Sequence, residues 1–306
     1  MRVQRQLRGA PGKPVALTIG NFDGVHRGHQ AMLSRLVEAA EDLGLRAAVL
    51  TFEPHPREFF TPASAPPRLS TLRAKLDAFR AYGVATTYVA RFDARFASLT
   101  ASEFVGDVLE GALSARWLLV GEDFRFGHGR AGDLALLRRA SRRFSVEAMR
   151  TVDVDGERAS STAVRAALAS GDLARAAALL GRNYAISGRV VHGDGLGRVL
   201  GFPTANLALR RTPPMTGIFA VNVHGLPGGV ARGVASLGVR PTVKADGAPL
   251  LEVYVLDFDG SIYGSRLTIE FLERLRDEQR FPDVDALTCQ IARDVDAARD
   301  YFAAAG

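Results

Sequence analysis

The chain has 306 residues, of which 47% are hydrophobic and 24% carry a charge. This length favours two domains, and the ordinary globular composition excludes wholesale disorder and a fibrous repeat. The formal net charge is +6, but the basic residues are spread along the chain and form no aromatic-basic recognition module, so we expect no nucleic-acid partner.

Cysteine usage and hydropathy limit the compartment. Cys289 is the single cysteine, which excludes an internal disulfide and any cysteine-rich zinc or iron–sulfur centre. Met1 is followed by Arg2, Gln4 and Arg5 instead of a long apolar run, and no apolar stretch is long enough to span a bilayer. We therefore expect a cytoplasmic protein with no membrane partner, as a monomer or a weak homo-oligomer.

The first half of the chain alternates β-rich runs with amphipathic helical stretches, which is typical of an α/β fold with a parallel sheet. Residues 15–19 are predicted to form a buried strand, and residues 30–43 a helix that ends before Gly44. Further strands are predicted at residues 47–52, 86–90, 117–120 and 146–152, and further helices at residues 72–82, 101–109 and 133–142.

The pattern changes at residues 181–185, after which short runs of alternating apolar residues are separated by glycine and proline. We place the domain boundary there, which gives an α/β domain at 1–183 and a mainly β domain at 184–306. An antiparallel barrel and a C-terminal helix at 284–304 are expected in the second domain. The predicted barrel strands are residues 186–191, 219–223, 230–237, 251–255 and 267–271.

The most informative stretch is residues 18–29, where a predicted strand gives way to a helix. Gly20, Gly24 and Gly28 allow a close approach of the backbone to a ligand, and a helix start offers free N–H groups to phosphate oxygens. His26 and His29 are three apart and share a helix face, so both can meet one polyphosphate. The alternatives are two ordinary surface histidines or a zinc-binding pair.

A second glycine-rich stretch covers residues 193–207. It is not a P-loop, because no Gly-Lys-Ser/Thr follows the glycines. Its backbone N–H groups can still bind phosphate, and the oxygens of Thr204 and Asn206 suit Mg²⁺. These two residues are two apart and share a face if the segment is extended. A hairpin loop followed by a strand is the plain alternative.

The residues around the histidines resemble a known signature. Residues 20–29, Gly-Asn-Phe-Asp-Gly-Val-His-Arg-Gly-His, resemble the HxGH motif of the nucleotidyltransferase superfamily, in the version found in bifunctional riboflavin kinase/FAD synthetases. Residues 120–127 resemble its second nucleotide-side motif, and residues 160–165 resemble its Ser-Ser-Thr-x-x-Arg segment. The resemblance implies a Rossmann-like domain in which His26 and His29 are catalytic.

The same resemblance assigns binding residues to this domain. Residues 52–56, Phe-Glu-Pro-His-Pro, resemble the family segment beside the flavin, which implies Phe52, Pro54 and Pro56 as flavin-binding residues. A Pro-rich loop after a strand is the alternative there, and a helix N-cap with a solvated arginine is the alternative at residues 160–165. The implied nucleotide-binding residues are Gly20, Asn21, Phe22, Asp23, Gly24, Asp123, Ser160, Ser161, Thr162 and Arg165.

The second domain resembles riboflavin kinases through Gly-x-x-x-Gly-Phe-Pro-Thr-Ala-Asn at residues 197–206. Residues 251–258 resemble the strand with the catalytic glutamate, so Glu252 is implied as general base, with a solvent-facing strand residue as the alternative. Residues 236–242 and 275–281 also match kinase segments, the latter beside the flavin through Arg276 and Glu278. Thr204 and Asn206 are also the expected metal ligands. The implied kinase nucleotide-binding residues are Gly193, Gly195, Gly197, Arg198, Pro203, Thr204 and Asn206.

Together the motifs imply an enzyme that makes FMN and ADP from riboflavin and ATP, then FAD and pyrophosphate from FMN and ATP, with Mg²⁺. A single-activity enzyme, or a flavin-sensing or RNA-binding protein on the same fold, is disfavoured by intact motifs in both halves. Ala74 departs from the family, in which many members have an acidic residue before Lys75. The glycines at 127, 129 and 132 match the dinucleotide fingerprint, but the preceding predicted strand ends too early for its tight turn.

Overall fold

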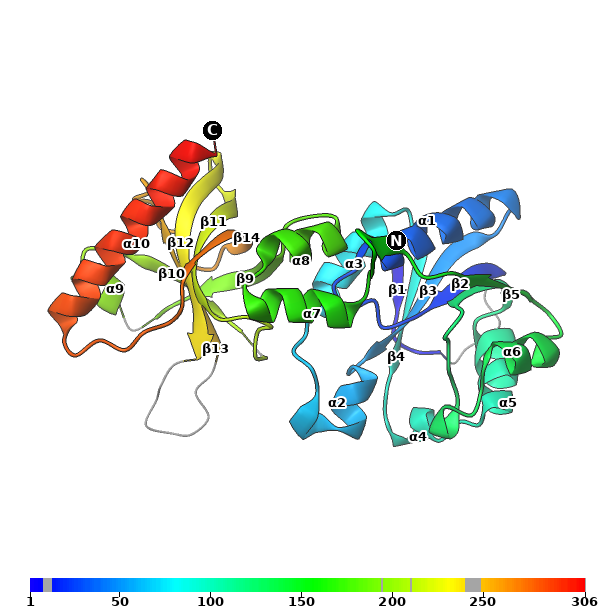
Figure 1. Ribbon diagram of the computed structural model, residues 1–306. Coiled ribbons are helices and arrows are strands. Elements are labelled where there is room, and N and C mark those ends of the chain that lie inside the picture. Colours follow the sequence, from blue (N-terminus) through cyan, green and yellow to red (C-terminus); the bar gives the residue numbers. More distant parts are fainter. Residues whose placement is uncertain (8–12, 194, 210, 240–248, 306) are drawn as a thin grey trace. The chain divides into compact units, whose positions relative to one another are not determined.

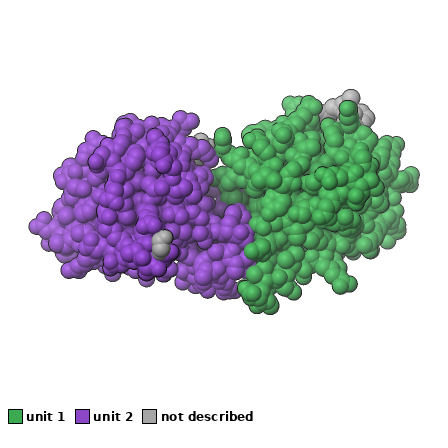
Figure 2. Space-filling view, turned by 90° about the horizontal axis from the view of Figure 1, so that it is seen from above, with its two compact units in different colours: residues 1–66, 70–160 green, residues 67–69, 161–306 purple. Residues whose placement is uncertain are grey.

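The computed structural model describes residues 1–7, 13–193, 195–209, 211–239 and 249–305. The chain divides into two compact units, shown in separate colours in Figure 2. The first contains residues 1–66 and 70–160, and the second contains residues 67–69 and 161–306. Helices α7 (Ser161–Ser170) and α8 (Leu173–Leu180) fall in the second unit in this division.

The first unit is built on a parallel six-stranded sheet with the order β1-β4-β3-β2-β5-β6 (Figure 1). The chain first adds β3 and β4 on one side of β2 and then β5 and β6 on the other, so the strand order reverses at β2. Such a switch point opens a crevice at the carboxyl ends of the strands. The strands are β1 (Arg2–Gln4), β2 (Val15–Ile19), β3 (Arg46–Glu53), β4 (Thr86–Arg91), β5 (Ala115–Gly121) and β6 (Ser145–Met149).

Helices cover both faces of this sheet, because its strands are apolar on both sides. Leu17 of β2 faces a core formed with α5 (Ala101–Glu103), the π-helical segment η2 (Phe104–Ala112) and α6 (Leu134–Ala140). Ala16 faces the opposite core, which contains residues of α1 (Arg27–Asp42) and α3 (Leu72–Ala81). The short elements are α2 (Pro56–Phe60), η1 (Pro62–Ser64), α4 (Ala94–Ala97), η3 (His128–Arg130), β7 (Asp153–Val154) and β8 (Glu157–Arg158).

The second unit contains a closed antiparallel barrel with the strand order β10-β13-β12-β11-β14-β9. Apolar residues alternate into its interior, and α10 (Val284–Ala304) packs on the outside of the barrel (Figure 1). The predicted fold class is therefore confirmed for both parts of the chain. The strands are β9 (Ala185–Val191), β10 (Thr204–Ala208), β11 (Gly217–Leu226), β12 (Gly229–Val239), β13 (Pro249–Val255) and β14 (Arg266–Arg276), and α9 (Leu196–Val199) is a short helix between β9 and β10.

Several predicted boundaries differ from the structure for local reasons. The first helix begins at Arg27 and not at residue 30, because His26 has extended dihedrals and serves as the N-cap. The strand predicted at 146–152 ends at Met149, and the β7–β8 hairpin follows it, with its own turn at Asp155 and Gly156, both of which have positive φ. Strand β1 was not predicted, as Val3 is its single apolar residue. Strand β10 was given only as the alternative in which a strand follows a hairpin loop.

A buried ion pair attaches α10 to the barrel. Arg276 Nε and Nη2 donate to the two carboxylate oxygens of Asp294 at 2.7 Å each, and the two side chains are 16% and 7% exposed. Gln290 Nε2 donates to the same carboxylate at 2.9 Å, and the guanidinium lies over the Phe281 ring at 5.7 Å. The two charges thus compensate each other. Removal of either partner would leave an uncompensated buried charge and destabilise the fold.

Asp294→Ala should lower the free energy of unfolding of the second unit by about 3–5 kcal/mol, because the charge of Arg276 would stay buried without its partner. Far-UV circular dichroism in guanidinium chloride measures this change. Arg299→Ala is the control, since Arg299 of α10 forms an exposed pair with Asp257 at 2.7 Å and the loss of this pair should leave the unfolding nearly unchanged. Equal effects of the two substitutions would contradict the buried-pair interpretation.

Candidate active sites

The strand-to-helix turn of the first unit has an unusual backbone. Phe22 and Val25 have positive φ angles of 50° and 44°, and Gly24 has a φ of 83°. The left-handed region of backbone dihedral angles is unfavourable for a β-branched residue such as Val25. Phe22 is fully buried and Val25 is 2% exposed, so tertiary packing imposes the conformation. The turn carries the chain from the end of β2 to His26 at the start of α1.

Hydrogen bonds from other segments hold this turn in place. Asp23 Oδ1 accepts from the backbone N–H of Ser70 at 3.0 Å and from its hydroxyl at 3.1 Å. The Gly24 N–H donates to Ser70 Oγ at 3.0 Å, and Lys75 Nζ donates to the carbonyl of Asn21 at 3.1 Å. Asp23 and Gly24 line neither cavity described below. Their visible contribution is therefore to fix the turn, while the predicted nucleotide contact stays a prediction.

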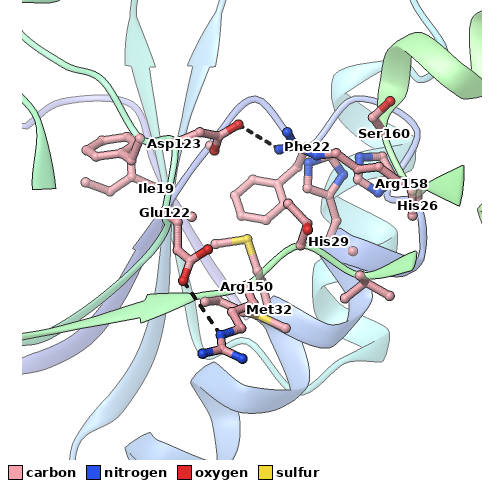
Figure 3. A pocket seen from close by; sticks show the side chains of 18 residues that line it. Ile19, Phe22, His26, His29, Met32, Glu122, Asp123, Arg150, Arg158 and Ser160 are labelled. Atoms are coloured by element: carbon pink, nitrogen blue, oxygen red, sulfur yellow. Dashed lines mark hydrogen bonds and ion pairs between the residues drawn. The ribbon is translucent and has the colours of Figure 1, made fainter. Parts of the chain in front are cut away.

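The two histidines of the motif lie together, as Figure 3 shows. Their ring centroids are 3.7 Å apart with an interplanar angle of 27°, and Phe22 packs against His29 at 4.9 Å. Burial lowers the pKa of His29 well below its ordinary value, and the neighbouring His26 and Lys75 lower it further. The imidazole of His29 is therefore neutral near pH 7, and an anion bound beside it would raise its pKa.

A cavity of about 220 Å³ opens beside these histidines, between the carboxyl ends of β2 and β5. Arg158 of the β7–β8 hairpin donates to Asp123 Oδ2 at 2.6 Å across it, and Arg150 lies 3.9 Å from Glu122 (Figure 3). The cavity therefore has imidazole N–H donors on one side and guanidinium groups on another, a combination suited to phosphates. The predicted site residues that line it are Gly20, Phe22, His26, His29, Asp123 and Ser160.

A larger cavity of about 760 Å³ adjoins the first, and Ile19, Gly20, Asp123 and Phe124 line both. Seven phenylalanine side chains line it, which suits a flat ring system, while the shared residues lead to the histidines. Among predicted residues, Asn21, Phe52 and Pro56 line it, but Pro54 does not. The aromatic side chains of the wall are Phe52, Phe60, Phe92, Phe96, Phe104, Phe124 and Phe126.

Some lining residues were missed from the sequence. Arg158 could have been found, since Asp155-Gly156 between two short β-compatible pairs is a strong hairpin signal, and the two residues have φ angles of 51° and 80°.

The Gly127–Gly132 stretch is a loop on the larger cavity, separated from the end of β5 at Gly121. It does not form the strand–turn–helix of a dinucleotide fingerprint.

The Ser-Ser-Thr-x-x-Arg segment is divided between the two units. Ser160 lines the smaller cavity, whereas Ser161, Thr162 and Arg165 belong to α7 in the second unit. Arg165 Nε donates to the carbonyl of Pro67 at 2.6 Å, and its Nη1 donates to that of Ser161 at 3.2 Å. The binding of nucleotide by these three residues stays a prediction.

In the second unit, strand register brings the predicted kinase residues together. Asn206 of β10 pairs directly with Glu252 of β13, and Thr204 pairs with Tyr254. Directly opposed residues of antiparallel strands project from the same face. The neighbours of Glu252, Leu251 and Val253, are fully buried in the barrel, so Glu252 and Asn206 project from its outer face side by side.

The glycine-rich segment covers this face closely. A Cβ atom at Gly193 would lie 2.6 Å from Cγ of Asn206, and one at Gly197 would lie 2.5 Å from the carbonyl oxygen of Phe202. Both positions therefore require glycine. Asn206 is 6% exposed, and its Oδ1 is buried with no hydrogen-bond partner among the described residues. Gly195, Arg198 and Pro203 are exposed on the same segment, and Asp194 lies outside the described residues.

The other predicted kinase residues occupy the end of β14 and the segment after it. Arg276 is held by Asp294 in the ion pair described above, so its guanidinium has a structural function whether or not it also contacts a flavin. Glu278 lies against Gly238 of β12, where a Cβ atom would collide with its carboxylate. Of the matching segment 236–242, residues 240–242 lie outside the described residues.

Among the helices of the described residues, none combines the length and the hydropathy that a membrane-spanning segment needs. No group of three or more histidine, cysteine, aspartate or glutamate side chains in that part of the chain could hold a metal ion.

Known proteins are similar to this chain over both of its parts. Residues 10–163 match the family model of FAD synthetase, and residues 180–302 match that of riboflavin kinase. A bifunctional riboflavin kinase/FMN adenylyltransferase of Pseudomonas fluorescens is 51% identical over 285 residues, covering 92% of this chain and 91% of the relative. A protein of the same name from Escherichia coli K12 is 48% identical over 299 residues, covering 97% and 95%.

A crystal structure from Streptococcus pneumoniae, named as a macrolide-efflux protein, is similar with a TM-score of 0.80 and 30% identity, covering 97% of this chain and 98% of that chain. The name applies to that protein and is not carried over to this chain. The structural similarity supports the arrangement of strands and helices in both parts. Over nearly its full length, and with both domain models matched in order, this chain belongs to the bifunctional riboflavin kinase/FMN adenylyltransferase family, which makes FMN from riboflavin and FAD from FMN.

Proposed function

We propose that residues 1–183 carry the adenylyltransferase and residues 184–306 the kinase. The observation that carries the first half of this proposal is the continuity of the two cavities, one aromatic and one lined by His26 and His29. FMN has a flat ring and a phosphate, so the aromatic cavity would bind its ring while its phosphate reaches the shared residues. ATP would then place its α-phosphate beside the histidines.

The adenylyl transfer is a direct displacement. An oxygen of the FMN phosphate attacks the α-phosphorus of ATP, a new P–O–P bond forms, and pyrophosphate leaves without a covalent enzyme intermediate. The protein contributes orientation and charge stabilisation. The neutral His29 donates an N–H to the phosphates, and their negative charge favours its protonation as pyrophosphate departs. Asp123 lines both cavities and accepts a hydrogen bond from Arg158, which lines the smaller one, so the reacting phosphates would meet beside this pair.

In the kinase, Glu252 takes the proton of the ribityl 5′-hydroxyl as that oxygen attacks the γ-phosphorus of ATP, which leaves ADP and FMN. The Asn206–Glu252 pair supports this assignment, because it places a carboxylate beside an oxygen ligand. The buried Oδ1 of Asn206 and the hydroxyl of Thr204 fit a hard cation, and Mg²⁺ would neutralise phosphate charge there. The glycine-rich segment above Asn206 would bind the phosphate tail through backbone N–H groups.

The composition of the chain supports a proposal about its compartment. A chain with one cysteine suits the reducing cytoplasm, and we place the enzyme there as a monomer or a weak homo-oligomer. Its partners are then its small-molecule substrates ATP, riboflavin and FMN.

His29→Ala should reduce FAD formation from FMN by about a hundredfold or more, because a hydrogen-bond donor to the reacting phosphates is lost. FMN formation from riboflavin should stay unchanged, since Glu252 and Asn206 belong to the barrel. Separate assays with FMN and with riboflavin, each with ATP, measure the two rates. Equal loss of both activities in a folded variant would contradict the assignment.

Glu252→Gln should have the converse effect. The amide keeps the size of the side chain but cannot accept the proton, so FMN formation should fall by about 10²- to 10⁴-fold. FAD formation from supplied FMN should continue at the unaltered rate. Kinase turnover retained within about a factor of two would remove Glu252 as the base.

A further inference from the structure

Helix α3 contains a buried lysine that the mechanism above does not use. Lys75 is 1% exposed and is among the largest fully buried side chains of the described chain. Lysine is almost never fully buried unless its charge is paired. Its Nζ donates to the carbonyl of Asn21 at 3.1 Å, in the turn between β2 and α1. The ammonium therefore approaches the phosphate-facing turn from behind.

Three contacts from this one region brace the same turn. Lys75 binds the carbonyl of Asn21, while Ser70, just before the helix, binds Asp23 and Gly24. Phe79, one turn after Lys75 on the same face of α3, packs edge-on against Phe22 at 5.2 Å. The bracing thus covers the residues on both sides of the strained Phe22.

The ring contacts of Phe22 extend from α3 to the two histidines. Phe22 lies between Phe79, at 5.2 Å, and His29, at 4.9 Å, and His29 stacks on His26 at 3.7 Å. Displacement of Phe22 would therefore move the imidazole of His29. Thr51 of β3 also donates to the Asn21 carbonyl, at 3.4 Å, but this bond is longer and carries no charge, so the ammonium is the stronger of the two contacts.

We propose that Lys75 is a positioning residue for adenylyl transfer: from behind the turn, its ammonium fixes the carbonyl of Asn21 and thereby the ring contacts that place His29 against the nucleotide phosphates. The function extends the adenylyltransferase assignment and uses no contact between Lys75 and a substrate. Because the conformation of Phe22 is unfavourable by itself, a fixed charge beneath it prevents relaxation to an ordinary turn.

The same charge also affects the protonation of His29. The charged groups that act on this imidazole are Lys75 from α3 and His26 from the start of its own helix, and both lower its pKa in addition to burial. Asp23, the acidic residue of the turn, is bound to Ser70. Removal of the ammonium should therefore raise the pKa of His29 towards its ordinary value, which gives a readout apart from turnover.

The test uses the full-length chain with Lys75→Met, which keeps a long side chain in the buried site but removes its charge. The turnover number for FAD formation should fall about ten- to a hundredfold, with the KM for ATP nearly unchanged, because a small displacement of His29 acts mainly in the transition state. The kinase rate of the same molecules should not change, since Glu252 and Asn206 belong to the barrel, and an unaltered far-UV circular dichroism spectrum shows that the first unit is folded. Lys13→Met, at an exposed lysine of the same unit, is the matched control and should leave both rates unaltered.

Histidine NMR of the free protein, with the His29 signal assigned through His29→Gln, provides the second measurement. In Lys75→Met the His29 titration should move to higher pH. An unaltered turnover number for FAD formation, or an unaltered His29 titration, would overturn the proposal.

If Lys75→Met does not fold, Lys75→Arg keeps the charge but moves the donor. FAD turnover should then fall while the His29 titration stays at low pH. Unaltered FAD turnover in the folded arginine variant would likewise overturn the proposal.

Discussion

The proposed adenylyltransferase site depends on one constraint, the forced turn between β2 and α1. Phe22 and Val25 are held at positive φ, against their own preferences, by burial and by hydrogen bonds of the turn with Ser70 and Lys75. This turn directs the start of α1 towards the crevice at the switch point of the sheet, where an anion would meet the positive end of the helix dipole. The smaller cavity, the stacked histidines and the access to the aromatic cavity all follow from that direction.

Polar groups also gather at the second site, but a different structural feature brings them together. In the first unit, polar groups gather because the carboxyl ends of parallel strands share one edge of the sheet. In the barrel, the antiparallel register of β10 and β13 places Asn206 beside Glu252, and glycines at 193 and 197 let the loop lie close over them. FMN is the product of one activity and the substrate of the other, so both sites must accept the same ring system.

Local signals in the sequence predicted much of the fold. The bounds of β2 and α10 were predicted correctly, since the first is a continuous apolar run and the second starts at the N-cap Asp283. The histidine pair, Asn206 and Glu252 were proposed from motifs, whereas the side-by-side position of Asn206 and Glu252 is seen only in the strand register. The positive φ of Phe22, the burial of Lys75 and the Asp123–Arg158 pair could not be, because each arises from contacts between distant segments. The domain boundary after residue 183 also stays a prediction, as α7 and α8 group with the barrel.

The central claim is that one chain carries two sites which act in sequence through FMN. The most direct test is a chromatographic time course of riboflavin, FMN and FAD after the purified protein is mixed with riboflavin, ATP and Mg²⁺. The account predicts that FMN appears first without delay and that FAD follows after a lag, which disappears when FMN is supplied. Accumulation of FMN with no FAD, or unchanged riboflavin, would contradict it.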